Sequence, residues 1–155
     1  MSEMVDWLLE QIAAEEQRAV AASAVSWEAA VPNMVHVVMD GTYGRKGLGY
    51  VASTDHQEHA DYIAAWHPVR VLAECEAKRR IVTAYQDYCT RMDAAWADYC
   101  NWVDGKPTAD TAPPSSSDDR GVKAGLEIAL RLLALPYSDR PGYRAEWAPA
   151  PAKRA

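Results

Sequence analysis

Residues 68–103, PVRVLAECEAKRRIVTAYQDYCTRMDAAWADYCNWV, decide the fold of this chain. Their apolar and aromatic side chains recur at alternating spacings of three and four residues, which is the pattern of a helix with one continuous seam. The seam consists of Val71, Cys75, Lys78, Val82, Tyr85, Cys89, Met92, Trp96, Tyr99 and Val103. Only Lys78 interrupts it. A helix of this length measures about 54 Å, so we expect it either to bend or to pack its far end against another surface.

The sequence also marks the two ends of this helix. Pro68 suits a first helical turn, where its missing N–H would have no partner, and His67 precedes it in the cap region. Beyond Val103, the run Asp104-Gly105-Lys106-Pro107 supplies the glycine and the proline at which helices end. The expected long helix therefore runs from Pro68 to about Val103.

Two more helices are predicted, one on each side of the long one. Residues 2–24 place apolar side chains at three- and four-residue spacing on one face, and Ser2 can cap the start. Residues 120–135 repeat this pattern, carry i,i+4 ion pairs on another face, and are followed by Pro136. The chain thus has three predicted helices.

A small β-hairpin is predicted at about residues 34–52. Residues 34–39 and 48–52 have strand composition, and the segment between them, residues 40–47, is a glycine-rich turn. A two-stranded hairpin is marginal by itself, so it must lean on the helices. The predicted fold class is mainly α, with three helices, one of them long, and a small inserted β-hairpin.

The domain organisation follows from length and composition. A chain of 155 residues can bury a core of its own, and we expect a single small α-rich domain over residues 1–147. Residues 108–119, TADTAPPSSSDD, are too poor in apolar groups to fold alone, which predicts a flexible loop at about residues 105–119. Residues 148–155, APAPAKRA, are expected to form a disordered tail.

Charge and cysteine content limit the partners that we expect. The formal net charge is −6: the residues before Asp118 carry a balance of −8, and the residues from Asp118 onward carry +2. Nonspecific binding to nucleic acid or to an anionic membrane needs an excess of cations, so we expect neither partner. No apolar run approaches the length of a membrane span, and the first residues are acidic where a secretory signal would be basic. Three cysteines without a CxxC pair predict reduced thiols and a cytoplasmic location.

Metal binding is the first candidate chemistry. His56 and His59 stand three residues apart beside Asp55 and Glu58, and on a helix they could hold one edge of a metal, with His36 or His67 as a third ligand. An HxxH pair without a second half of the motif has little specificity. The favoured interpretation is a histidine-rich polar connector, with no metal and no cofactor.

Two other segments invite a phosphate-binding interpretation. The glycine-rich residues 41–49 include Arg45 and Lys46, but they lack GxxxxGK[ST] and a following helix N-terminus, so a solvated turn is favoured. The triplet 78–80, Lys-Arg-Arg, could contact phosphate or an acidic partner. Glutamates four residues before Lys78 and Arg80 favour intrahelical pairing instead.

Nucleophilic and acid–base catalysis have little support in the sequence. None of the three cysteines has a histidine near it in sequence, GxSxG and SxxK are absent, and no spacing singles out a pair of carboxylates. The aromatic residues Trp96, Tyr99 and Trp102 could form a ligand platform or a partner surface, although an aromatic helix seam is more often core.

The C-terminal strip, residues 136–147, is expected to act as a structural clasp. It carries Pro136, Tyr137, Asp139, Tyr143, Glu146 and Trp147. We expect this strip to lie across the first half of the long helix, near residues 72–82, with Tyr137 and Trp147 as anchors. Lys78 falls on the apolar seam, where an unpaired ammonium is costly. Asp139 or Glu146 is therefore expected to pair with Lys78 or Arg79.

Two segments carry a resemblance to a known family. Residues 65–82, AWHPVRVLAECEAKRRIV, and residues 130–147, LRLLALPYSDRPGYRAEW, resemble the domain-of-unknown-function 6221 family of actinobacterial and actinophage proteins. The resemblance implies a small, mostly helical domain, and it offers no catalytic residues.

The leading functional hypothesis is a noncatalytic cytoplasmic interaction or accessory protein of phage or mobile-element origin, with an unknown protein partner. Exposed apolar residues at the far end of the long helix would be a liability unless they were paired, which predicts a homodimer through that helix. Two alternatives stay open. One is a small metal-dependent or phosphate-handling enzyme that uses His56 and His59. The other is a regulator that contacts nucleic acid through Arg79, Arg80 and the weakly basic C-terminal part.

Overall fold

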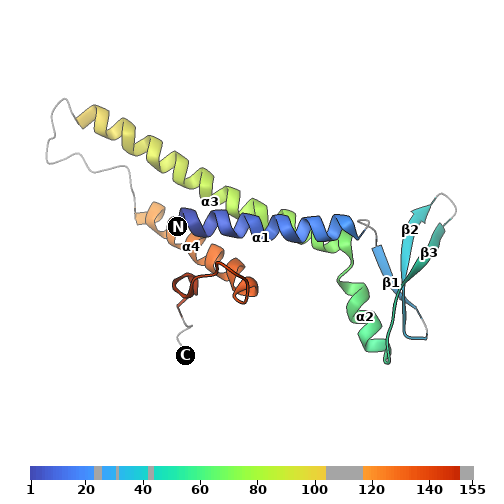
Figure 1. The fold of residues 1–155 in the computed structure, drawn as a ribbon. Coiled ribbons are helices and arrows are strands. Elements are labelled where there is room, and N and C mark those ends of the chain that lie inside the picture. Colours follow the sequence, from blue (N-terminus) through green and yellow to red (C-terminus); the bar gives the residue numbers. More distant parts are fainter. Residues whose placement is uncertain (23–25, 31, 42–43, 104–116, 151–155) are drawn as a thin grey trace. The chain divides into compact units, whose positions relative to one another are not determined.

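A computed structural model describes residues 1–22, 26–30, 32–41, 44–103 and 117–150 of the chain (Figure 1). The α-helices are α1 (Ser2–Ala21), α2 (Gln57–Ala65), α3 (Pro68–Val103) and α4 (Ser117–Ala134). The strands are β1 (Ser26–Ala30), β2 (Met34–Gly41) and β3 (Gly44–Ser53), and two short 3-10 helices, η1 (Leu135–Tyr137) and η2 (Ala145–Trp147), follow α4. The mainly helical class is confirmed. The prediction of three helices is wrong, because the described residues contain four.

The chain divides into two compact units. The sheet unit is Glu10–Ala77, and the terminal unit joins Met1–Leu9 to Lys78–Ala155. Helices α1 and α3 contribute residues to both. The single domain over residues 1–147 stays a prediction. Among the described helices, none is long and apolar enough to cross a membrane.

The sheet unit contains a three-stranded antiparallel sheet in the order β1-β2-β3. The predicted hairpin is present as β2 and β3, in a register that places Val35 opposite Ala52. The strands extend into the glycine-rich segment, and residues 42–43 lie outside the described residues. Strand β1 is not among the predicted elements, because its five residues, SWEAA, are too few for a clear alternation. Strand β1 gains its stability from pairing with β2, where Trp27 lies opposite Val37.

Helix α2 is the second element that the sequence analysis missed. It begins one residue after His56, in the segment interpreted as a polar connector, and it is only nine residues long. Helices this short are marginal in water and depend on packing. Here Ala60 and Ala64 form a buried cluster with Val35 of β2, and Ile63 packs against it. The sheet thus stabilises a helix that local sequence alone does not predict.

A turn around Asn33 holds the start of α2 against the sheet. Asn33 has a left-handed backbone with φ of 52°, a conformation that asparagine tolerates better than most residues. Its N–H donates to Oε1 of Gln57 at 3.1 Å, and its Nδ2 donates to the carbonyl of Asp55 at 3.2 Å. The N–H of Thr54 in turn donates to the Asn33 carbonyl at 2.9 Å.

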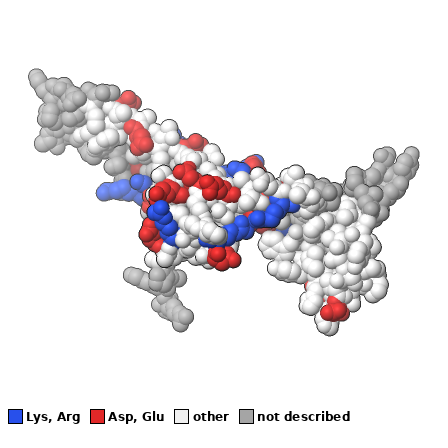
Figure 2. Space-filling model, in the orientation of Figure 1, with Lys and Arg blue, Asp and Glu red and all other residues white. Residues whose placement is uncertain are grey.

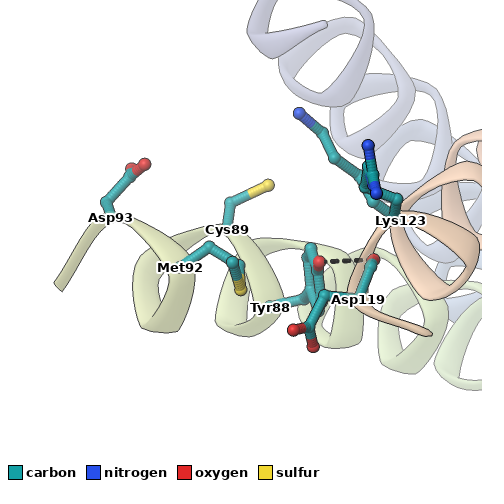
Figure 3. Close-up of a pocket in the computed structure, with 7 residues that line it drawn as sticks. Tyr88, Cys89, Met92, Asp93, Asp119 and Lys123 are labelled. Atoms are coloured by element: carbon teal, nitrogen blue, oxygen red, sulfur yellow. Dashed lines mark hydrogen bonds between the residues drawn. The ribbon is translucent and has the colours of Figure 1, made fainter. Parts of the chain in front are cut away.

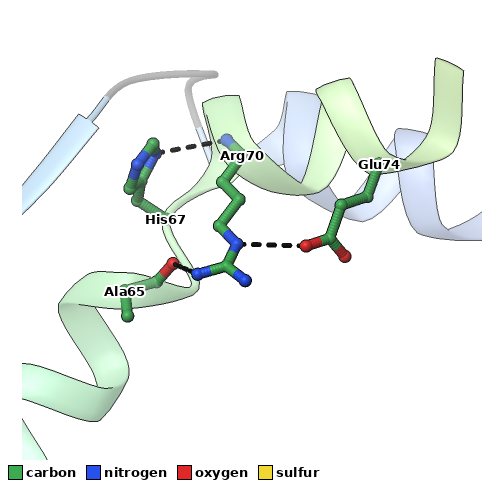
Figure 4. Close-up of polar contacts among 4 residues, drawn as sticks. All are labelled: Ala65, His67, Arg70 and Glu74. Atoms are coloured by element: carbon green, nitrogen blue, oxygen red, sulfur yellow. Dashed lines mark hydrogen bonds and ion pairs between the residues drawn. The ribbon is translucent and has the colours of Figure 1, made fainter. Parts of the chain in front are cut away.

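The junction between α2 and α3 is built around Arg70 (Figure 4). The N–H of Arg70 donates to Nδ1 of His67 at 3.2 Å, so His67 caps α3 as the sequence indicates. The Arg70 guanidinium donates to the carbonyl of Ala65 at 3.1 Å and pairs with Glu74 at 3.0 Å. It also lies 4.7 Å from the ring of Trp66. Helix α3 therefore begins at Pro68 with its first turn fixed to the end of α2.

The core of the terminal unit takes residues from α1, α3, α4 and the C-terminal strip. Its buried apolar residues are Met4, Val5, Trp7, Leu8, Val82, Tyr85, Tyr88, Leu130, Ala134, Tyr137 and Trp147. Helix α3 ends at Val103, as predicted. Helix α4 begins at Ser117, three residues earlier than predicted. Residues 105–116 of the predicted loop lie outside the described residues, and so do residues 151–155 of the predicted tail.

Candidate functional site

Three aromatic rings of the terminal unit gather around Trp7 of α1. The ring of Trp7 lies 6.3 Å from Tyr137, 5.7 Å from Tyr143 and 5.2 Å from Trp147, centroid to centroid. Tyr137 and Trp147, the two expected anchors of the strip, are 1% and 8% exposed. We call Trp7, Tyr137, Tyr143 and Trp147 the aromatic cluster. Trp7 was missed in the sequence, where it is one residue in the first helix with no local sign of its distant partners.

The turn at Pro141 and Gly142 fits closely against Trp7. Nε1 of Trp7 donates a hydrogen bond to the carbonyl of Pro141 at 3.0 Å. Gly142 has a φ of +86°, and a Cβ at this position would lie 2.9 Å from Nε1 of Trp7. Glycine is therefore required here both by the backbone conformation and by the approach of the indole.

Lys78 contacts Tyr137 of the C-terminal strip. Its Nζ donates to the hydroxyl of Tyr137 at 2.7 Å and lies 5.1 Å from the centroid of that ring. The guanidinium of Arg140 also lies over the Tyr137 ring, at 4.9 Å. The hydrogen bond to the Tyr137 hydroxyl offsets part of the cost of placing an ammonium on the apolar seam.

Charged side chains at the edge of the cluster pair with one another. Arg144 contacts Glu3 at 2.7 Å and Glu146 at 3.7 Å. Arg131 of α4 donates to the backbone carbonyl of Glu146 at 2.6 Å, while Asp139 is exposed. In Figure 2, basic and acidic side chains lie interspersed on the visible face.

The structure thus brings Lys78, Tyr137, Tyr143 and Trp147 together, while Arg79 is half-buried on α3. The contact between Lys78 and Tyr137 lies within the part of α3 where the strip was expected. Trp147 packs on Trp7 of α1, which the sequence analysis did not anticipate. The stabilising role of the clasp stays a prediction.

A cavity of about 250 Å³ lies between α3 and α4 (Figure 3). Its lining residues are Tyr88, Cys89, Met92, Asp93, Asp119, Arg120 and Lys123. The hydroxyl of Tyr88 donates to the backbone carbonyl of Asp119 at 2.6 Å and so ties the two helices together. An apolar cavity of about 150 Å³ can hold a benzene ring, so this one can accept a single large side chain.

Tyr85 lies one turn before this cavity and is buried. Burial raises its pKa well above the ordinary value, and the thiol of Cys89 and the carboxylate of Glu127 raise that pKa further. A raised tyrosine pKa keeps the hydroxyl protonated at neutral pH, which disfavours its use as a base.

The far half of α3 exposes apolar side chains of the seam. Trp96 is 54% exposed, and its ring lies 5.6 Å from that of Tyr99 at an interplanar angle of 34°. Met92 is half-buried and lines the cavity between α3 and α4. The side chains of Trp102 and Val103 lie outside the described part of the structure. In contrast, Val82 and Tyr85, earlier on the same seam, are buried within the terminal unit.

The predicted metal candidates lie in the sheet unit. The rings of His56 and His59 are 5.3 Å apart and nearly perpendicular. Within the described ranges, no three His, Cys, Asp or Glu side chains come together as a set that could hold a metal ion. The three cysteines are free thiols, with Cys75 buried, Cys89 half-buried and Cys100 exposed.

The chain is thus a mainly helical protein with a small antiparallel sheet and an aromatic cluster in which Trp7 packs against three residues of the C-terminal strip. It belongs to the family of unknown function DUF6221, whose sequence profile matches residues 1–149. The match spans both segments that carry the resemblance and confirms it. Neither the curated proteins nor the solved structures yielded a match to this chain.

Proposed function

We propose that this protein is a noncatalytic interaction protein that binds a protein partner through the far half of α3. We call Met92, Trp96, Tyr99 and the adjoining cavity between α3 and α4 the α3 surface. The observation that carries the proposal is the exposed Trp96, which lies beside Tyr99 on the same seam whose earlier residues Val82 and Tyr85 are buried.

The chemistry of the α3 surface suits a protein contact. Tryptophan, tyrosine and methionine are enriched at the centres of interfaces, where one large side chain commonly fills a pocket on the other protein. The cavity beside Met92 has the volume for such an anchor, and Lys123 at its wall can meet an acidic or polar rim.

The type of partner follows from charge. The net charge of −6 and the pairing of Arg144 with Glu3 support a protein partner over a nucleic acid. A second copy of the chain is an alternative occupant, as in the homodimer predicted through the long helix.

A cytoplasmic setting is part of the proposal, supported by the exposed thiol of Cys100. The proposed phage or mobile-element origin rests on the sequence resemblance. The identities of the genes that flank the gene of this protein would test that origin.

The test uses the tagged full-length protein in its native cell. Trp96→Ser should remove a co-purifying protein and leave the melting temperature unchanged, because the ring is 54% exposed. Tyr62→Ser is the matched control, since Tyr62 is an aromatic residue of the sheet unit that is 68% exposed. The same bound proteins in the wild type and in both variants would contradict the proposal.

A further inference from the structure

Helix α4 has apolar side chains on two opposite faces. One face carries Leu130 and Ala134, which are fully buried in the terminal unit. The opposite face is a line of residues spaced by four, three, four and three: Gly121, Gly125, Ile128, Leu132 and Leu135, which directly follows the helix. We call this line the α4 stripe. Ile128 is 53%, Leu132 is 52% and Leu135 is 39% exposed.

Within the described ranges, no contact requires glycine at either of the two glycine positions of the α4 stripe. A Cβ added to Gly121 or to Gly125 would meet no atom within 4 Å. Glycine is among the least favourable residues for a helix interior. Two of them, one turn apart on the exposed side of α4, leave room for another backbone or side chain to approach this face closely.

We infer that α4 pairs in antiparallel orientation with α4 of a second copy of this chain. The order of residue sizes along the α4 stripe supports this occupant. Gly121 and Leu135 each lie seven residues from Ile128, and Gly125 and Leu132 lie three and four residues from it. A two-fold axis at Ile128 thus places each leucine of one copy opposite a glycine of the other. Small residues facing large ones let the two faces interlock.

The charges are compatible with the same pairing. In an antiparallel pair, the positive N-terminal end of each α4 lies beside the negative C-terminal end of the other. Among the charged residues of α4 whose side chains the structure describes, Arg131 lies nearest the stripe; it would face Ala124 of the second copy, and its guanidinium already donates to the carbonyl of Glu146.

The expected dimer is weak and reversible. Stable specific complexes bury about 1,200–2,000 Å² in total, and a contact between two helices of about five turns falls below that range. Association should therefore depend on protein concentration in the micromolar range or above. This surface is separate from the α3 surface, and the two can be tested independently.

Sedimentation velocity over a concentration series of the full-length protein is the test. Wild type should shift from monomer to dimer. Ile128→Lys should remain monomeric, because it places two lysines against each other at the two-fold axis. Val122→Lys is the matched control: Val122 lies on the same helix away from the stripe and is 51% exposed, so this variant should dimerise like wild type.

Two further variants test the role of the two glycines and distinguish pairing through α4 from pairing through the α3 surface. Gly121→Ala with Gly125→Ala should raise the melting temperature of the dilute monomer, because alanine favours the helix, and should weaken dimerisation at least tenfold. Trp96→Lys, which alters the α3 surface, should leave dimerisation unchanged. A wild type that stays monomeric at every concentration, or a dimer lost in Trp96→Lys and kept in Ile128→Lys, would overturn the inference.

Discussion

Trp147→Ala is expected to destabilise the terminal unit severely. The indole is 8% exposed and lies 5.2 Å from Trp7 and 5.9 Å from Tyr143. A buried tryptophan removes roughly 150–250 Å² from water, which at about 25 cal/mol per Å² gives an upper bound of roughly 4–6 kcal/mol. Measured truncations of large aromatic residues in cores cost about 3–5 kcal/mol. We therefore expect a loss of about 3–4 kcal/mol.

Urea denaturation followed by circular dichroism measures this loss. Trp96→Ala is the control, because its ring is 54% exposed and exposed positions usually change stability by less than about 0.5 kcal/mol. The double variant with Trp7→Ala should show a coupling of about 0.5–1.5 kcal/mol, since the two rings are in contact. Equal small losses for Trp147→Ala and Trp96→Ala would refute the clasp.

Five further outcomes are expected. Tyr137→Phe should lower the free energy of unfolding in urea by about 1–3 kcal/mol, because a charge-assisted hydrogen bond is lost. Tyr143→Phe should leave that free energy unchanged or raise it, because the buried Tyr143 hydroxyl has no partner among the described residues. Gly142→Ala should lower the melting temperature by strain at positive φ and by a clash with Trp7. The free energy of unfolding should fall as the pH rises above about 10, the pKa of tyrosine in the unfolded chain. The reason is that the pKa of Tyr85 is raised in the folded state, so the folded protein keeps this proton at a pH where the unfolded chain loses it. Tyr85→Phe should reduce that fall. EDTA should leave the melting temperature unchanged.

The sequence predicted best the elements whose signals are local. Helix α3 runs from Pro68 to Val103 because a proline fixes its start and a long periodic seam defines its course. The C-terminal strip could be recognised from its prolines and aromatic residues, and both expected anchors, Tyr137 and Trp147, are buried.

The missed elements depend on contacts that are distant in the sequence. Helix α2 is short and polar at its start, and its alanines gain their burial from the sheet. Strand β1 has too few residues to show a pattern before it pairs with β2. Trp7 could not be identified as the centre of the aromatic cluster, because its hydrogen-bond acceptor, Pro141, is 134 residues away.

A photo-crosslinking amino acid at position 96 would test the interaction role most directly. Position 94 is the control, because Ala94 is exposed on the same helix and lies about 200° away from position 96 around its axis. Irradiation of cells that make each variant at the native level should give an adduct to one partner protein from position 96, and none from position 94. The same pattern of adducts from both positions, or none from either, would contradict the assignment of the α3 surface as a protein-binding site.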